Sequence, residues 1–254
     1  MAELKTIADY LNTLLDIRRF PDDASNNGLQ IEGTPVVNKI AFGVDASLVL
    51  AEKAAEAGAD MIFVHHGLSW GTGFRRITGV DAARIATLLK NDISLYAAHL
   101  PLDAHPVIGH NAVIAETIDL INRKMFAEYA NDKIGVRGEL PKAMGAASLA
   151  DMLEDRLGFD TAVYGKPRGK LKRIGVVSGG AGTDGILAAA AKNLDCLITG
   201  EIGHSHWHLI NELALTVITG GHYNTEKPGI KALIEDVENM FDVECVFFDI
   251  PTGL

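Results

Sequence analysis

Two adjacent histidines, His65 and His66, follow the apolar run Met61 to Val64 and precede Gly67. Adjacent residues on a β-strand point to opposite faces, so both imidazoles can reach one site only where the strand ends and the chain turns. Gly67 permits such a turn. Ligands of α/β proteins bind at the carboxyl ends of strands, and neutral imidazoles suit a divalent transition metal. The pair therefore predicts part of a metal site.

Further polar residues follow other predicted strands. His222 and Glu226 lie four positions apart after a Gly-Gly turn, a spacing that places two side chains on one helical face. Thr225 is expected to cap the helix that begins there, and Pro228 is tolerated in its first turn. In the first half of the chain, Asp103 follows a strand predicted to end at Ala98.

The candidate ligands together combine imidazoles and carboxylates, and they exceed what one catalytic zinc needs. They are sufficient for two metals bridged by a carboxylate and a water, a centre that supplies hydroxide at neutral pH and favours hydrolysis. Asp103 and Glu226 both fit the bridging position, and spacing does not decide between them. The predicted metal ligands are His65, His66, Asp103, His222 and Glu226.

Each ligand also has an ordinary structural explanation. Asp103 can cap a turn, His222 can be a loop residue, and Glu226 can be a first-turn acid favoured by the helix dipole. His99 is expected beside the ligands, supporting them rather than binding metal. The histidine cluster His204, His206 and His208 is expected either to line the cleft or to lie on the surface.

A glycine-rich segment at residues 178–182 follows one predicted strand and precedes a helix. Such a turn can bind an anion at the helix N-terminus, or it can simply be a tight connection. The segment lacks the Lys-Ser/Thr of a Walker loop and does not fit G-x-G-x-x-G. No G-x-S-x-G elbow is present, and neither cysteine pairs with a nearby histidine in the sequence, so covalent catalysis is disfavoured.

The elements that must position these residues alternate between apolar strands and Ala-rich helices, which is typical of βαβ units. The predicted strands span residues 40–44, 61–64, 94–98, 174–177, 196–199, 216–218 and 243–248, and the predicted helices span 48–57, 82–90, 185–192 and 209–213.

The two halves of the chain share order and spacing. The run KIAFGV from Lys39 resembles RIGVVS from Arg173, and Asp60 precedes one strand as Asp195 precedes another. A third correspondence aligns residues 91–95 with 211–215. The pattern predicts two related α/β domains, although unrelated βαβ units would share it too. The polar stretch 122–137 is the best boundary, which gives domains at 1–125 and 126–254.

Composition limits the function classes. The 254 residues are 48% hydrophobic and carry a net charge of −10, which argues against non-specific attraction to nucleic acid. Arg75 with Arg76, or residues 166–173, could still form a local basic patch. Cys196 and Cys245 lie in apolar runs and are expected to be buried thiols in a reducing compartment. No apolar run approaches the roughly 20 residues of a membrane span, so a cytoplasmic location is expected.

Five motifs give the chain a specific resemblance. They are Asn26-Asn27-Gly28-Leu29-Gln30, Val64-His65-His66-Gly67, His99-Leu100-Pro101-Leu102-Asp103, Thr199-Gly200-Glu201 and Gly221-His222-Tyr223-Asn224-Thr225-Glu226. On these motifs the chain resembles the GTP cyclohydrolase I type 2 homologue family, also called the NIF-three-like family, in its short form without an insertion domain. The histidine-rich run after Glu201 departs from the family pattern.

The resemblance implies two similar α/β domains with mixed sheets flanked by helices, around a cleft that holds a dinuclear metal site. It places His65, His66, Asp103, His222 and Glu226 in the ligand positions, and it implies a ring-shaped homohexamer. We therefore expect a metal-dependent hydrolase of the GTP cyclohydrolase type, with two divalent ions per chain (zinc, iron, manganese or nickel) and a nucleotide-like substrate. The alternative is a metal-binding adaptor without turnover.

Overall fold

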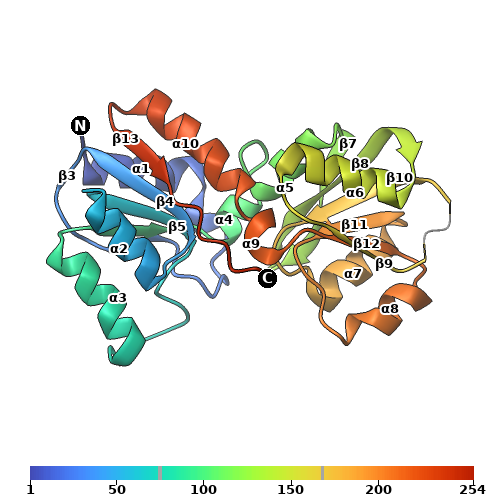
Figure 1. Ribbon diagram of the computed structural model, residues 1–254, viewed down its shortest axis with the longest axis horizontal. Coiled ribbons are helices and arrows are strands. Elements are labelled where there is room, and N and C mark those ends of the chain that lie inside the picture. Colours follow the sequence, from blue (N-terminus) through green and yellow to red (C-terminus); the bar gives the residue numbers. More distant parts are fainter. Residues whose placement is uncertain (74–75, 167–168) are drawn as a thin grey trace. The chain divides into compact units, whose positions relative to one another are not determined.

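The computed structural model describes residues 1–73, 76–166 and 169–254, so Arg75 and Arg168 of the predicted basic patches lie outside the described residues. The chain forms two compact units (Figure 1). Unit 1 comprises Met1–Leu102 and Ile230–Ile250, and unit 2 comprises Asp103–Gly229 and Pro251–Leu254. The chain thus passes into unit 2 at Asp103, earlier than the expected boundary after residue 125, and it returns to unit 1 for one helix and one strand.

Unit 1 contains a five-stranded mixed sheet of order β13-β4-β5-β6-β2. β13, β4, β5 and β6 are parallel, and β2 runs antiparallel to β6 at the edge. The strands are β2 (Gly28–Ile31), β4 (Lys39–Asp45), β5 (Met61–His66), β6 (Ser94–Ala97) and β13 (Glu244–Phe247), with a separate pair β1 (Ala2–Glu3) and β3 (Val36–Val37). The helices are α1 (Leu4–Leu14), α2 (Leu48–Glu56), α3 (Gly79–Lys90), α4 (Leu100–Asp103) and α10 (Pro228–Met240), with a 3-10 turn at Ile17–Arg19.

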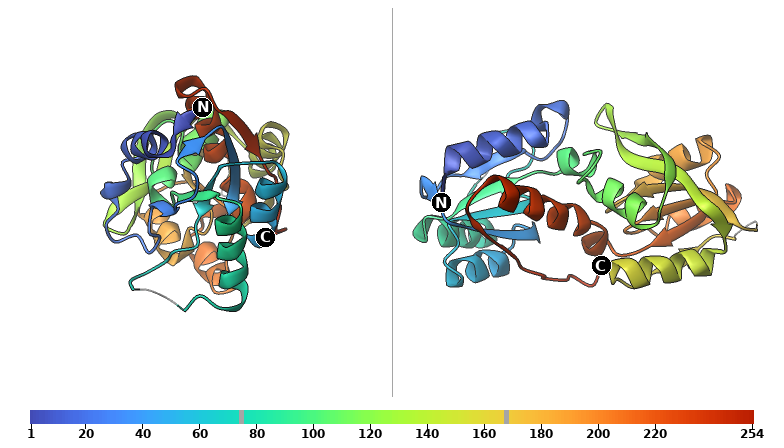
Figure 2. Two further views of the ribbon diagram at one scale, coloured as in Figure 1. Left: turned by 90° about the vertical axis from the view of Figure 1, so that its left-hand side faces the viewer. Right: turned by 90° about the horizontal axis from the view of Figure 1, so that it is seen from above.

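Alternating side chains give the unit 1 sheet two apolar faces. Ala41, Ile62 and Leu95 pack in one core with residues of α2 and α3. On the other face, Phe42, Phe63 and Tyr96 stack across the three strands with ring centroids 5.7 Å apart. The Tyr96 hydroxyl donates to Asn12 on α1, so helices cover both faces (Figure 2).

Unit 2 contains a six-stranded mixed sheet of order β7-β8-β10-β11-β12-β9, in which β10, β11 and β12 are parallel and the other pairings are antiparallel. The strands are β7 (Ile121–Tyr129), β8 (Asp132–Met144), β9 (Ala162–Tyr164), β10 (Leu171–Val177), β11 (Cys196–Thr199) and β12 (Thr216–Thr219). The helices are α5 (His110–Thr117), α6 (Ala146–Leu157), α7 (Gly182–Ala191), α8 (His206–Glu212) and α9 (His222–Thr225). Residues of α5 and α6 pack in one core, and residues of α7 and α8 pack in another.

The strand registers confirm the internal repeat. Ile40 pairs with Met61 as Ile174 pairs with Cys196, which is the offset that the Lys39–Arg173 and Asp60–Asp195 correspondences require. The third correspondence is wrong by two positions, because Met61 pairs with Ser94 and Cys196 with Thr216. In the corrected alignment the single turns α4 and α9 are equivalent. The fold class, two similar α/β domains with mixed sheets, is confirmed.

Two segments do not follow a division of the chain at residue 125. The polar stretch 122–137 is a β-hairpin, because β7 and β8 pair antiparallel and β8 continues onto β10. Its polar side chains follow from exposure, since most of β7 is exposed. The final strand, β13, pairs with β4 in unit 1 rather than with a strand of the second half. None of the described helices is long and apolar enough to cross a membrane.

Candidate metal centre

His65 and His66 occupy the last two positions of β5, so the strand runs through the pair instead of ending before it. His65 is fully buried, whereas about a fifth of the His66 side chain is exposed. The two rings nevertheless lie 4.6 Å apart between centroids and are tilted by 53°. His99, after β6, completes an imidazole cluster with centroid distances of 5.0 Å and 5.6 Å to the other two rings.

The hydrogen-bond partners of these three rings define which nitrogen can bind a metal. Nδ1 of His65 lies 3.0 Å from the carbonyl oxygen of Ala98. Nδ1 of His66 lies 2.8 Å from Asp45 Oδ1, and Nδ1 of His99 lies 2.8 Å from Asp23 Oδ1. Each of these partners only accepts, so Nδ1 carries the proton and Nε2 carries the lone pair. This arrangement matches histidines that bind metals, whose second nitrogen is held by a carboxylate or a carbonyl.

Asp23 fixes the segment that carries His99. Its carboxylate accepts hydrogen bonds from the backbone nitrogen of Ser25, the side-chain amide of Asn27 and the backbone nitrogen of Leu100. Burial raises the pKa of Asp23, but the hydrogen bonds from His99, Asn27 and Ser25 outweigh burial and lower the pKa overall. Asp23 therefore stays ionised and holds the His99 ring in place.

The three imidazoles of unit 1 each offer a ligand atom within 4.8 Å of the other two. His99 is therefore a possible ligand by geometry, whereas the sequence analysis expected it only to support the ligands. The useful signal was its position directly after β6, next to β5 in the sheet. This group of residues in unit 1 could bind a metal ion.

In unit 2, Asp103 ends α4 and is buried. Its Oδ1 accepts a hydrogen bond of 2.7 Å from the Ser178 hydroxyl, and Asn111 joins the same network by accepting from the Ser178 backbone nitrogen. Asn111 also donates to the Asp103 carbonyl oxygen. The Asp103 carboxylate is therefore oriented by Ser178, the residue that follows β10.

His222 and Glu226 lie together in unit 2, with Nε2 of His222 3.1 Å from Glu226 Oε1. Nδ1 of His222 lies 3.3 Å from Glu201 Oε1. The hydrogen bond to Glu226 first, then its charge and the contact with Glu201, raise the pKa of His222 to about 9 despite partial burial. The two side chains are in contact, as their i, i+4 spacing predicted.

The local backbone explains why Glu226 reaches His222. Glu226 follows α9 and precedes α10, which begins at Pro228. Thr225 does not cap a helix, which is a correction; its hydroxyl accepts from the Gly179 backbone nitrogen and donates to the Gly221 carbonyl oxygen. Gly179 has φ +59°, and a Cβ there would clash with Glu226 Oε1. Glycine at this position therefore makes room for the carboxylate.

Other candidate residues take supporting or separate positions. The glycine-rich segment forms a tight connection between β10 and α7. Its backbone nitrogens donate to side chains of the protein: Ser178 to Asn111, Gly179 to Thr225 and Ala181 to Thr199. His110 lies near Asp103, but its Nδ1 accepts from the Gly229 backbone nitrogen, so Nε2 carries the proton in the neutral ring.

The second histidine cluster lies at the start of α8. His204 and His208 are exposed, and His206 is half-buried and accepts from the Gly203 backbone nitrogen. None of the three joins a group of ligand atoms in the part of the chain that the structure describes. Both cysteines are free; Cys196 is buried as predicted, whereas Cys245 is only half-buried.

Comparison with known proteins shows the family. Residues 2–253 match the model of the Duf34/NIF3 (NGG1p interacting factor 3) family, and the chain belongs to this family. Proteins called GTP cyclohydrolase 1 type 2 homolog share 43% identity with it in Deinococcus radiodurans, over 96% of this chain and 92% of that protein, and 43% in Pyrococcus horikoshii, over 98% of each. Among solved structures, a protein ybgI of unknown function matches with a TM-score of 0.92 and 35% identity over 100% of both chains. TTHA1606 from Thermus thermophilus matches with a TM-score of 0.87, 37% identity and the same coverage.

Proposed function

We propose that this protein is a hydrolase that binds two divalent metal ions per chain. The ligands would be His65 and His66 from unit 1 and Asp103, His222 and Glu226 from unit 2. The observation that carries the proposal is the donor chemistry of each unit. Unit 1 presents imidazoles whose Nδ1 atoms are held by acceptors, and unit 2 presents ordered carboxylates and a histidine. Mixed nitrogen and oxygen donors suit zinc, iron, manganese or nickel.

A dinuclear centre of this kind lowers the pKa of bound water and supplies hydroxide at neutral pH. The chain's own residues hold and orient the ligands. Asp45 keeps the proton of His66 on Nδ1, Ser178 fixes the Asp103 carboxylate, and Glu201 contacts Nδ1 of His222. Such outer contacts raise ligand basicity and fix ring orientation. The relatives' names support a nucleotide-like substrate, which we propose for this chain too.

The ligand set is not that of a structural metal site, which is typically closed, four-coordinate and rich in cysteine. Cys196 and Cys245 are free thiols outside the candidate centre, and burial raises the pKa of both. This difference favours a catalytic centre over a metal-binding adaptor. We also propose a homohexamer, which the family resemblance implies, and a cytoplasmic location, which the sequence composition favours.

Metal analysis of protein purified without chelator tests the ligand assignment. We expect close to two ions per chain, and Asp103→Ala or Glu226→Ala should lose at least one of them. His204→Ala provides a matched control, because this exposed histidine lies outside the proposed set. Full metal occupancy in both carboxylate variants would refute the site.

Turnover separates the hydrolase from the adaptor. Metal-loaded protein should hydrolyse a member of a panel of nucleotides and phosphoesters, and His222→Ala should abolish that activity. A protein that holds two ions, hydrolyses nothing in the panel and binds a partner only when metal is present would be the adaptor instead.

A further inference from the structure

Unit 1 contains a cavity of about 550 Å³ at the carboxyl end of β5. It is bounded by β2, by the loop from Gly67 to Trp70, and by α3. Several residues of α3 line the cavity, and Leu88 is the only buried residue of this helix. Its volume falls within the range of small-molecule sites, about 300–1,000 Å³. The position is also the one at which α/β sheets bind ligands.

The loop wall of this cavity is fixed by hydrogen bonds. Gln30 Oε1 accepts from the backbone nitrogens of Leu68 and Ser69 at 2.8 Å and 3.0 Å. The Trp70 indole nitrogen donates to the Gly67 carbonyl oxygen at 2.8 Å. A Cβ at Gly67 would collide with the Gln30 amide, so glycine is needed for this packing. The Trp70 ring is therefore held in one orientation before any ligand arrives.

Trp70 belongs to both the cavity and the imidazole cluster. Its ring centroid lies 5.2 Å from that of His99 and 6.1 Å from that of His66. A planar group stacked on this indole would lie beside the candidate metal ligands of unit 1. Stacking of a base on an aromatic side chain stabilises nucleotide binding whatever the base, because every base has a π-face.

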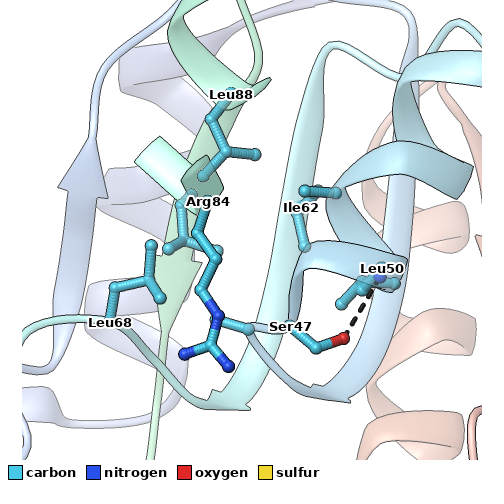
Figure 3. A pocket seen from close by; sticks show the side chains of 9 residues that line it. Ser47, Leu50, Ile62, Leu68, Arg84 and Leu88 are labelled. Carbon is cyan, nitrogen blue, oxygen red and sulfur yellow. Dashed lines mark hydrogen bonds between the residues drawn. The ribbon is translucent and has the colours of Figure 1, made fainter. Parts of the chain in front are cut away.

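Arg84 supplies a positive charge that forms no ion pair within the described part of the chain. Its side chain lines the cavity and also a small neighbouring pocket, where it reaches from α3 into the space between Leu68 and Ser47 (Figure 3). Its Nε atom is buried and makes no hydrogen bond to any residue that the structure describes. Glu32 and Asp81 also line the cavity, but neither forms an ion pair with Arg84 among the described residues. A buried donor that lacks a hydrogen-bond partner is costly.

We infer that this cavity binds a nucleoside phosphate, with its base stacked on Trp70 and its phosphates at Arg84. Arg76, at the exposed rim, adds a second cation. The planar guanidinium matches the geometry of phosphate oxygens. The inference rests on the proposed function, because it names the substrate class of the same centre and the residues that select it.

Tryptophan fluorescence provides a direct test. Trp70 and Trp207 are the two tryptophans of the chain, so Trp207→Phe makes Trp70 the sole reporter. In this background GTP should quench Trp70 saturably, and guanosine should quench it at least tenfold more weakly. Arg84→Met, which keeps the aliphatic stem, should weaken GTP binding at least tenfold and leave guanosine binding unchanged. Arg84→Lys should recover part of the loss.

The matched control is Lys90→Met, which removes one charge from the same helix at an exposed position outside the cavity lining. It should leave both affinities unchanged. Glu226→Gln separates this inference from the proposed function, because it should lose metal and activity yet retain GTP quenching. If Arg84→Met weakens GTP and guanosine equally, or leaves GTP unchanged while Glu226→Gln abolishes quenching, the inference is wrong.

Discussion

The two units share a scaffold but place different chemistry at the same register position. The pair Ile40–Met61 in unit 1 is equivalent to the pair Ile174–Cys196 in unit 2. Five residues further along each strand, Asp45 is equivalent to Gly179, and His66 is equivalent to Glu201. In unit 1 the Asp45 carboxylate binds the His66 ring. In unit 2 the equivalent position is a glycine, and Glu226 from the α9–α10 connection occupies the space that a side chain would fill.

This difference shows how a repeated fold can supply two kinds of donor. Unit 1 uses carboxylates of its own strand and loop to orient imidazoles. In unit 2 the carboxylates themselves are candidate ligands. Ser178 orients Asp103, and Glu226 occupies the space beside Gly179, whose backbone nitrogen donates to Thr225. The single turns α4 and α9 occupy equivalent positions after β6 and β12, yet Asp103 ends the first, whereas Glu226 follows the second.

Gly179→Ala should give the largest effect on this comparison. A left-handed φ costs alanine about 1–2 kcal/mol, and the added Cβ must also displace Glu226. We expect the free energy of unfolding to fall by about 2 kcal/mol or more and metal content to drop. The matched control is Gly180→Ala, whose nearest atom would be Glu201 Oε1 at 3.4 Å, an ordinary contact. Equal effects in denaturant unfolding and metal analysis would mean that Gly179 does not make room for Glu226.

Asp45→Ala should weaken metal binding by about 10–100-fold, the usual cost of removing a carboxylate that orients a metal-binding histidine. The equivalent test in unit 2 is Glu201→Ala. About half of the Glu201 side chain is exposed and its contact with His222 is 3.3 Å, so we expect less than about a tenfold loss there. Metal affinity from competition with a chelator measures both. A larger loss of metal affinity in Glu201→Ala than in Asp45→Ala would contradict the stronger orienting role that we assign to Asp45.

The sequence predicted this comparison only in part. The β5 and β11 runs, the histidine pair and the i, i+4 spacing of His222 and Glu226 are local signals, and local signals specify strands and shared faces well. The pairing of β13 with β4, and the passage of the chain into unit 2 at Asp103, depend on which elements pack together. Such packing is a long-range property that hydrophobic periodicity does not encode.

The supporting residues were missed for a related reason. Asp23 and Asp45 carry no motif, and their role appears only when His99 and His66 are placed beside them. Ser178 was noticed as part of a glycine-rich turn, although its function in the fold is to hold Asp103. In each of these cases the residue acts through a neighbour distant in sequence, which spacing alone cannot reveal.

The His222 ring should show the strongest pH effect in metal-free protein. Its pKa of about 9 lies above the unfolded value of 6.5, so its contacts with Glu226 and Glu201 stabilise the fold fully below about pH 6.5. This contribution should be lost as the pH rises through about 9. An NMR titration of the ring should give a midpoint near 9, and Glu226→Gln should move it towards 6.5. An unchanged midpoint in that variant would show that Glu226 does not control His222.

The smallest expected effect compares Asp60 and Asp195, which lie at the opposite ends of the strands from the candidate ligands. Asp60 Oδ2 accepts from the backbone nitrogens of Asn38 and Lys39, and Asp195 Oδ2 accepts from those of Lys172 and Arg173. Asp195 Oδ1 also accepts from the Arg173 guanidinium at 2.8 Å. Asp60 forms no ion pair with any residue that the structure describes.

Asparagine can keep one accepting oxygen, so Asp60→Asn should be nearly neutral. Asp195→Asn should cost up to about 1 kcal/mol, because its amide would face the guanidinium and the pair is partly exposed. Burial raises the pKa of Asp195, but its bonds to Arg173 and Lys172 lower it overall, so this stability should be lost only at acid pH. Urea unfolding at neutral and acid pH measures the difference. Metal content should not change in either variant. A loss of bound metal in only one variant would mean that the N-terminal ends of the strands also affect the candidate centre.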